Sequence, residues 1–386
     1  MLPDLAAVVR PGDGVVVGQA CAEPQTLVEA LVAQRAAFSG ARVFLGVNYS
    51  GIVKPEHADH LRLSAYCGAG HNRALAEAGV LDIHPHPYSR LGALIRAGAI
   101  RCDVVLLQLS PPDARGEYSL GLAADYLVPA LETARAIVAE VNHRVPWTHS
   151  ERLLRREDLA LVVESSREPA PAPAARSGAL ETAIGRHAAE FVPDGGVLEF
   201  GLGALPDAVG LALEGRRGLS VHSGTVGDSV ATLMAAGALE RVDCAMLMGS
   251  RRLFDLARGN AAIRLRSVEY THDPGVLLGL QRFIAINSAL EVDLTGQVNA
   301  EVAGGRYLGA VGGALDFVRA ANQSPGGVSL LVLPAARIVE SLQGPVATPR
   351  SEAGVVITER GAADLRGCAL RERIRRMLAI SDMRRT

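Results

Sequence analysis

Lysine and aromatic residues are scarce in this 386-residue chain. Lys54 is the only lysine, so mechanisms that use a lysine nucleophile or a Schiff base have almost no residue on which to form. Phe, Trp and Tyr together make up 4% of the residues, which argues against aromatic platforms that stack on nucleic-acid bases. The formal net charge is −2, so the chain lacks the excess of positive charge that typically attracts a nucleic-acid phosphate backbone. We therefore expect no nucleic-acid partner.

Disulfide frameworks, metal clusters and membrane spans also lack support. The cysteines are odd in number, widely spaced and without a Cys-x-x-Cys motif, which is typical of a reducing cytoplasm and not of a structural zinc site. The first 14 residues contain neither the basic nor the apolar region of a signal peptide, and no apolar run reaches the roughly 18 residues of a membrane span. We expect a cytoplasmic protein with no metal and no membrane partner. The five cysteines are Cys21, Cys67, Cys102, Cys244 and Cys368.

The chain does contain a regular alternation of apolar runs and helical patterns. Valine- and leucine-rich runs such as residues 14–19 and 104–109 predict buried strands, and residues 25–38 have the period of a helix. Strands that alternate with helices indicate parallel sheets covered by helices, which is an α/β fold. Residues 165–177, SSREPAPAPAARS, read as an extended linker. We therefore predict two domains, residues 1–170 and residues 178–386.

The two halves of the chain resemble each other. Five residues of the first half recur 182 positions later without a gap, and a later Asp-x-x-Gly motif recurs at an offset of 180. The recurrence favours two open, mainly parallel α/β domains of similar topology, with chance similarity between βα units as the alternative. The recurring residues are Pro11, Gly14, Val15, Pro24 and Leu31, matched by Pro193, Gly196, Val197, Pro206 and Leu213.

Residues 197–228 form the stretch around which the rest of the chain is organised. An apolar run at 197–200 predicts a strand, a glycine-rich turn follows at 201–206, and residues 207–213 have a helical pattern. A second short strand, 219–222, ends at Ser223-Gly224. A strand, a glycine turn and a helix N-terminus together can bind the phosphates of a nucleotide-bearing ligand. An ordinary tight βα turn is the alternative.

Four further sites carry side chains or backbone that could do chemistry. Glu291 and Asp293 share a strand face and are either an acid and base pair or turn-capping residues. Adjacent glycines at 309–313 can direct N–H groups at an oxyanion, or can simply form a flexible loop. His272 lies in a polar turn typical of a surface histidine, and Glu359 stands at a strand end, where site carboxylates are often found.

Several motifs resemble the acetyl-CoA hydrolase/transferase family of class I CoA-transferases. The most specific is INSALEVDLTGQVNAE at residues 286–301, and residues 110–113, 201–209, 312–317 and 356–361 also match. The match runs nearly end to end. The resemblance implies two open α/β domains that bind coenzyme A as an acyl-CoA substrate, with no metal. It also implies a small carboxylate as acceptor and a homodimer.

The resemblance assigns roles to residues of this chain. In the family a glutamate attacks the acyl-CoA thioester, a glutamyl-CoA thioester forms, and an acceptor carboxylate then takes the CoA. By the resemblance, Leu290 and Gly313 contact the CoA, Gly312 belongs to the backbone turn that serves the oxyanion, and Glu359 lies near the reacting thioester. The residues expected to line the CoA are Gly201, Leu202, Gly203, Ala204 and Leu205.

The sequence departs from the family at two positions. The nucleophilic glutamate usually follows His-Ser or His-Thr, whereas here His222-Ser223 precedes Gly224. An asparagine that serves the oxyanion usually stands where His272 aligns. Because glycine cannot form an anhydride, the usual transfer cannot run through this position.

Three readings follow. In the first, the chain is an acyl-CoA enzyme in which water replaces the glutamate, with His272 or Glu359 as base, and it hydrolyses a thioester or cleaves a β-keto acyl-CoA. In the second, another carboxylate, with Glu199 and Glu291 nearest, supplies the nucleophile and CoA transfer survives. In the third, the chain binds acyl-CoA without turnover, as a subunit of a complex. The first is the reading we predict.

Overall fold

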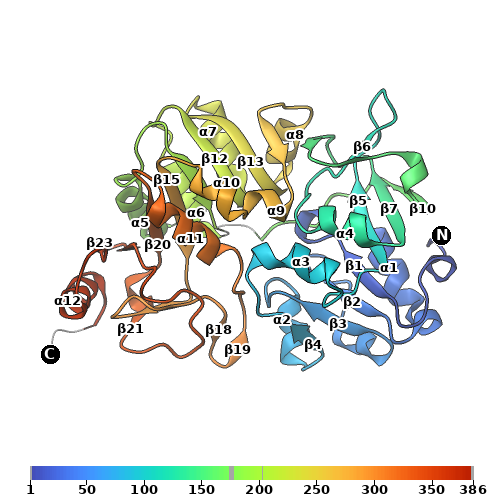
Figure 1. Cartoon of the computed structure of the whole chain (residues 1–386), viewed down its shortest axis with the longest axis horizontal. Coiled ribbons are helices and arrows are strands. Elements are labelled where there is room, and N and C mark those ends of the chain that lie inside the picture. Colours follow the sequence, from blue (N-terminus) through green and yellow to red (C-terminus); the bar gives the residue numbers. More distant parts are fainter. Residues whose placement is uncertain (1, 174–177, 202, 384–386) are drawn as a thin grey trace. The chain divides into compact units, whose positions relative to one another are not determined.

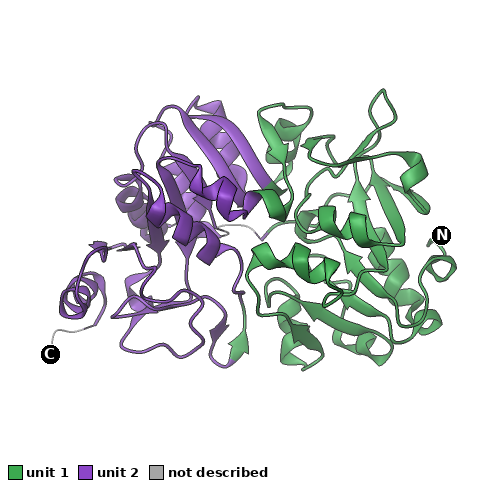
Figure 2. Cartoon of the chain, in the orientation of Figure 1, with its two compact units in different colours: residues 1–172, 245–270, 306–308 green, residues 173–244, 271–305, 309–386 purple. Residues whose placement is uncertain are grey.

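The computed structural model describes residues 2–173, 178–201 and 203–383, and the chain forms two compact units (Figure 2). The first unit contains Met1–Ala172, Ala245–Tyr270 and Arg306–Leu308, and the second contains Pro173–Cys244, Thr271–Gly305 and Gly309–Thr386. The first unit thus ends near the predicted boundary at residue 170, but it also takes in two later segments that we placed in the second domain.

The first unit is built on a seven-stranded parallel sheet in the order β10-β7-β5-β1-β2-β3-β4 (Figure 1). Every residue of β1 and β5 is buried, as expected for central strands of a sheet with both faces covered. The strands are β1 Gly14–Val17, β2 Arg42–Phe44, β3 Arg62–Ala65, β4 Leu81–Ile83, β5 Val104–Leu109, β7 Ala136–Asn142 and β10 Leu161–Ser165. The helices between them are α1 Gln25–Ala33, α2 Asn72–Glu77, α3 Leu91–Arg96 and α4 Leu127–Thr133.

Backbone pairing explains why residues 245–270 belong to the first unit. Strand β14, Ile263–Leu265, pairs in parallel with β8, His149–Ser150, and the Leu247 N–H donates to the Leu122 carbonyl at 2.8 Å. Such contacts join residues more than 100 positions apart, which composition along the chain does not reveal. Short elements complete this unit: β6 Tyr118–Ser119, β9 Leu153–Leu154, α8 Arg251–Ala257, β19 Arg306–Tyr307 and most of α9 Val268–Thr271.

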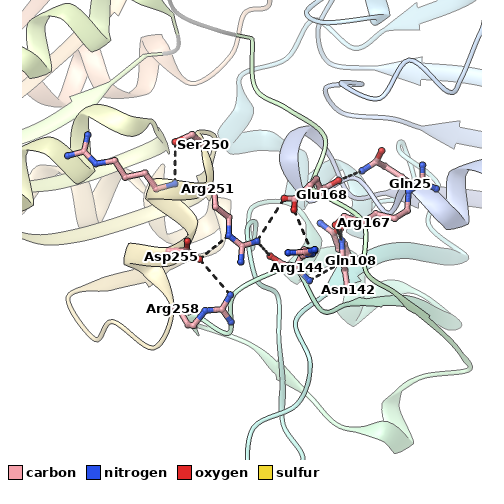
Figure 3. A network of polar contacts seen from close by, with 11 residues as sticks. Gln25, Gln108, Asn142, Arg144, Arg167, Glu168, Ser250, Arg251, Asp255 and Arg258 are labelled. Carbon is pink, nitrogen blue, oxygen red and sulfur yellow. Dashed lines mark hydrogen bonds and ion pairs between the residues drawn. The ribbon is translucent and has the colours of Figure 1, made fainter.

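A polar network fixes helix α8 within the first unit (Figure 3). Arg251 donates to the Arg144 carbonyl at 3.0 Å and forms ion pairs with Asp255 at 3.0 Å and Glu168 at 3.9 Å. Glu168 also accepts through its backbone carbonyl from the Gln25 side chain, at 2.9 Å. Segments from three separate parts of the sequence therefore meet at this point.

The second unit has a sheet of similar order to the first. Its strands follow the order β23-β22-β20-β15-β11-β12-β13. Like β1 in the first unit, β11 is an interior strand, with the next strand of the chain, β12, on one side and a later strand, β15, on the other. The pairs β11–β12, β11–β15, β15–β20 and β20–β22 are parallel, and β23 pairs antiparallel with β22. The strands are β11 Val197–Phe200, β12 Leu219–Val226, β13 Leu239–Leu247, β15 Phe283–Ser288, β20 Val328–Val332, β22 Val355–Thr358 and β23 Gly361–Asp364. This agreement confirms the predicted fold class of two mainly parallel domains of similar topology.

Helices cover the sheet of the second unit. Phe317 of α11 packs with Phe283 and Ala285 of β15, and Val197 of β11 lies against the same cluster. Because side chains alternate along a strand, Phe200 points to the other face, where Gly210 of α6 lies beside its ring. The helices are α5 Ala179–Ala189, α6 Ala204–Leu211, α7 Asp228–Ala235, α10 Pro274–Leu278, α11 Ala314–Gln323 and α12 Leu370–Ile380.

Small elements lie outside the main sheets. Strand β16 pairs in parallel with β21 and antiparallel with β17. These strands are β16 Glu291–Asp293, β17 Val298–Asn299 and β21 Ile338–Val339, and β18 is Val302–Ala303. The 3-10 helices are Leu5–Ala7, Ala20–Ala22, Arg35–Phe38, Pro55–Asp59, Tyr88–Arg90, Arg156–Asp158 and Ala335–Arg337. Within the described ranges, no helix has the length and apolarity required to cross a bilayer.

Candidate active site

One face of the second unit's sheet carries a row of buried polar residues near the carboxyl ends of its strands. Glu199 on β11 pairs with Ala285 on β15, and Leu198 pairs with Val221 on β12. The register therefore places His222 beside Glu199, and alternation places Gly224 on the same face. In open parallel sheets, ligands gather outside the carboxyl ends of the strands. This is the edge that the glycine turn after β11 predicts.

The His272 ring fills the space beside Gly224. A Cβ atom added at Gly224 would lie 3.1 Å from Cε1 and 3.3 Å from Nε2 of His272, and one added at Gly313 would overlap Nε2. The ring also packs on Phe317, with centroids 4.5 Å apart. Gly313 has φ −94°, so glycine serves there to leave room for the ring and not to permit an unusual backbone. His272 is thus a buried residue and not the surface residue that its polar turn suggested.

Burial holds His272 in a neutral form. Its Nδ1 lies 2.9 Å from the Thr271 hydroxyl, and the Thr271 carbonyl accepts from His222 Nε2 at 2.9 Å. His272 is 2% exposed. Burial, and to a lesser extent the nearby His222, lowers the pKa of His272 to about 3. The imidazole is therefore neutral at physiological pH.

A buried carboxyl group lies further along the same face. Asn287 on β15 donates from Nδ2 to Oε2 of Glu199 at 2.7 Å. Burial raises the pKa of Glu199 to about 8, although hydrogen bonds from Asn287 and from the Ile286 backbone oppose the shift. Glu199 is therefore mainly protonated at pH 7.

The turn expected to line the CoA lies next to Asn287. The Gly201 N–H donates to the Ile286 carbonyl at 2.8 Å, and a Cβ at Gly201 would lie 3.2 Å from Asn287 Oδ1. Gly203 has φ +119°, a conformation that favours glycine, and Ala204 and Leu205 open helix α6. Leu202 lies outside the described residues. Helix α6 therefore begins directly after the turn, three residues earlier than predicted.

A small cavity adjoins the Gly309–Gly313 turn. Its volume is about 30 Å³, which is room for about two water molecules. Asn287, Ser288, Val311 and Ala314 are among the residues that line it. Gly312 has φ +62°, in the left-handed region, so this turn depends on glycine at that position.

The other predicted site residues lie elsewhere in the second unit. Glu359 follows β22. Three strands, β20, β15 and β11, lie between β22 and β12, the strand that carries Gly224. At the usual spacing of strands, β22 and β12 are therefore about 19 Å apart. Its Oε2 accepts from the Ala335 N–H at 2.9 Å. Leu290 is half-buried and donates its N–H to the Asn299 carbonyl at 3.0 Å. The structure brings His272 and Gly313 together at Gly224, and does not bring Glu359 to them.

The paired carboxylates hold turns. Glu291 Oε1 accepts from the Asn299 side chain and from the Gln343 and Gly344 backbones, at 2.6–3.2 Å. Asp293 accepts four hydrogen bonds from Thr295 and Gln297. The turn-capping alternative therefore describes both residues.

Two contributors to the site were missed from the sequence. Phe317 and Thr271 contact His272 through packing that no local pattern reveals. The pairing of Asn287 with Glu199 had only a partial signal. A period of two assigns each residue to a face of its own strand, but the register that puts both on the same face comes from the structure.

Comparison with known proteins agrees with the motifs. Residues 2–171 match the model of the acetyl-CoA hydrolase/transferase N-terminal domain, and residues 249–385 match that of the C-terminal domain. The chain is 33% identical over 387 residues to the 4-hydroxybutyrate coenzyme A transferase of Clostridium kluyveri, covering 95% of this chain and 90% of that protein.

Solved structures show the same architecture. RipA from Yersinia pestis superposes with a TM-score of 0.94 at 27% identity, covering 99% of this chain and 93% of that one. A 4-hydroxybutyrate CoA-transferase from Porphyromonas gingivalis gives 0.83 at 30% identity, covering 98% and 92%. The chain therefore belongs to the acetyl-CoA hydrolase/transferase family and is an enzyme of that acyl-CoA hydrolase and CoA-transferase group.

Proposed function

We propose that this chain is a hydrolytic acyl-CoA enzyme, in which a water molecule replaces the glutamate nucleophile of the family. The observation that carries the proposal is the His272 ring against Gly224. The position has no carboxylate, and a neutral imidazole occupies the adjacent space. The water oxygen attacks the thioester carbonyl, the C–S bond breaks, and the proton lost by the water ends on the CoA sulfur. For a β-keto acyl-CoA, the water oxygen instead attacks the keto carbonyl and the bond between that carbon and the α-carbon breaks. The proton lost by the water ends on the α-carbon, which gives a carboxylic acid and a shortened acyl-CoA.

The neighbouring carboxylates are poor nucleophiles. Glu199 is 2% exposed, and its pKa of about 8 keeps it protonated at neutral pH. Glu291 binds two backbone N–H groups and one side-chain amide. A carboxyl group that is protonated or already engaged attacks a thioester weakly. Both observations support water over another carboxylate.

In this proposal His272 orients the attacking water. A base works best when its pKa lies near the working pH, and burial places the pKa of His272 at about 3. We therefore propose that His272 Nε2 forms a hydrogen bond with the water, and that His272 does not act as the base that takes up the proton. Backbone N–H groups of the Gly312-Gly313 turn would stabilise the oxyanion. Gly201, Gly203, Ala204, Leu205, Leu290 and Gly313 would contact the CoA. Glu359, as the other proposed base, would need to reach the site from β22.

The test is release of free thiol from a panel of acyl-CoAs, with and without acetate. Hydrolysis predicts thiol release that does not depend on acetate, while a retained, shortened acyl-CoA indicates C–C cleavage. Exchange that requires acetate would contradict the proposal. Measurable CoA binding without any turnover would instead identify a binding subunit.

A second candidate is CoA transfer to a small carboxylate, which the transferase name of the Clostridium kluyveri relative favours. Transfer through a carboxylate requires a glutamyl-CoA thioester. Borohydride or hydroxylamine should then inactivate the enzyme after acyl-CoA is added, and mass spectrometry should find CoA on a glutamate. Hydrolysis by water predicts neither result. A homodimer, as the resemblance implies, belongs to the proposal in either case.

A further inference from the structure

We infer that Glu199 is a positioning residue of this site, whose carboxyl group fixes the Asn287 side chain between the glycine turn expected to hold CoA and the cavity beside Gly313. The inference deepens the proposed function and rests on it, because it takes the ligand of this edge to be an acyl-CoA. It does not depend on whether water or a carboxylate other than Glu199 attacks the thioester.

The contact that carries the inference is a buried hydrogen bond between neighbouring strands. Asn287 Nδ2 donates to Glu199 Oε2 at 2.7 Å, and the two side chains belong to residues that are 7% and 2% exposed. Both lie on the face covered by α11. A buried amide needs a fixed partner, and Glu199 supplies it.

Asn287 borders the proposed ligand site, so fixing its side chain also fixes part of that site. Its side chain lines the cavity with Ser288, Val311 and Ala314, and Gly201 lies against its Oδ1. One hydrogen bond therefore sets the position of a side chain that borders both the proposed CoA turn and the proposed oxyanion turn. A misplacement of about 1 Å in such a group can cost roughly a hundredfold in rate.

The charge state of Glu199 follows from its surroundings. The titratable residues on the elements against this face are His222 on β12, His272 and Asp273 between α9 and α10, and Asp316 and Arg319 on α11. Arg319 is exposed and pairs with Glu352 at 3.2 Å. Burial dominates the shift in the pKa of Glu199, and no neighbouring charge contributes to it. Ionisation above pH 8 would place a negative charge close to a developing oxyanion and to an anionic ligand, which disfavours both.

The test compares Glu199→Gln and Glu199→Ala with the unaltered enzyme between pH 6 and pH 9.5. Glutamine keeps the acceptor for Asn287 and cannot ionise, so it should retain kcat/KM at pH 7 within about threefold and remove the decline above pH 8. Alanine removes the acceptor and should lower kcat/KM about tenfold below pH 8, the loss that follows from one hydrogen bond worth about 1.4 kcal/mol. Because alanine cannot ionise, this variant should also lack the decline above pH 8. An unchanged alkaline decline in Glu199→Gln would overturn the inference.

The matched control is Asp207→Asn. Burial also raises the pKa of Asp207, but this side chain accepts from Ser229 on α7 at 3.2 Å and does not contact Asn287. The variant should keep the alkaline decline of the unaltered enzyme.

A binding measurement separates this inference from the proposed function. Calorimetric titration with free CoA at pH 7 and pH 9 should show weaker binding at pH 9 for the unaltered enzyme and equal binding for Glu199→Gln, even if no acyl-CoA is turned over. Equal pH dependence in both proteins would overturn the inference and leave the proposed function standing. Circular dichroism of each variant checks that it is folded.

Discussion

Glycine and histidine residues share one space at the centre of the candidate site. The His272 ring leaves no room for a side chain at Gly313 and little at Gly224, so the two departures from the family pattern that we propose, at 224 and at 272, would have a common physical basis. A carboxylate at 224 and an imidazole at 272 compete for the same volume. We therefore expect these positions to change together.

Restoring the glutamate tests this competition. Gly224→Glu alone should give little transferase activity, because the new Cβ would lie 3.1 Å from the ring. Gly224→Glu combined with His272→Asn should give acetate-dependent CoA exchange at least tenfold above the single variant, which corresponds to about 1.4 kcal/mol. His272→Asn alone is the control and should lack exchange. Equal exchange in the single and double variants would show that the ring does not block the position.

His272 should make the protein sensitive to acid. The native pKa is about 3 and the unfolded value about 6.5, so the unfolded state binds more protons between these pH values. The free energy of unfolding should therefore fall below pH 6.5, by up to about 1.4 kcal/mol per pH unit. His272→Asn should lose less thermal stability between pH 7 and pH 5 than the unaltered protein. Equal losses in the two proteins would contradict this assignment.

Single elements show how far the sequence predicts this structure. Val104–Leu109 is a strand as its apolar run predicted, and the glycine turn lies between β11 and α6 as expected. Helix α6 begins before Pro206, because proline is tolerated in a first turn that lacks N–H partners. Strand β12 continues past Gly224 to Val226, where the Ser223 hydroxyl bonds to the backbone of Phe200 and Thr225.

The candidate site was harder to predict than its elements. The family motifs predict that Gly201, Gly313 and Gly224 lie near the ligand, but they do not reveal that His272 is buried. That fact depends on packing of Phe317 and on space left by two glycines far apart in the chain. Likewise, the carboxylates of β16 look like acid and base until their backbone partners are seen.

The turn after β16 should depend strongly on Asp293. Its Oδ1 accepts from the Thr295 N–H and hydroxyl and from the Gln297 N–H, and its Oδ2 accepts from the Gln297 amide. Asp293→Ala should lower the free energy of unfolding by about 2–3 kcal/mol, because four partly buried donors lose their acceptor. Asp293→Asn keeps the three Oδ1 bonds and should cost less than half as much. Urea denaturation measures both, and equal losses would contradict the assigned role.

For the whole molecule, the sheets of the two units have similar strand orders, as the spaced recurrence of glycine, proline and valine predicted. They also differ in a way that the recurrence did not predict, because the first unit takes back Ala245–Tyr270 and Arg306–Leu308 after the second has begun. The later segment Ala245–Tyr270 is joined to the first unit by backbone hydrogen bonds to β8 and to Leu122.

The thiol chemistry of the whole chain follows from burial. All five cysteines are free, four are buried, and Cys368 is partly exposed. Ellman's reagent should therefore modify one thiol in the native protein and five after denaturation in guanidinium. Cys368→Ala should abolish the native reaction. Fewer than five thiols after denaturation without reductant would indicate a disulfide.

Because the first unit takes back a later stretch of chain, it cannot be completed in the order in which it is synthesised. During synthesis, β8 cannot pair until β14 has left the ribosome, more than 100 residues later. By then the first strands of the second unit have already emerged and can pair with each other. A gene cut at the linker would likewise yield two incomplete fragments, and expressing both together would be needed to recover either one.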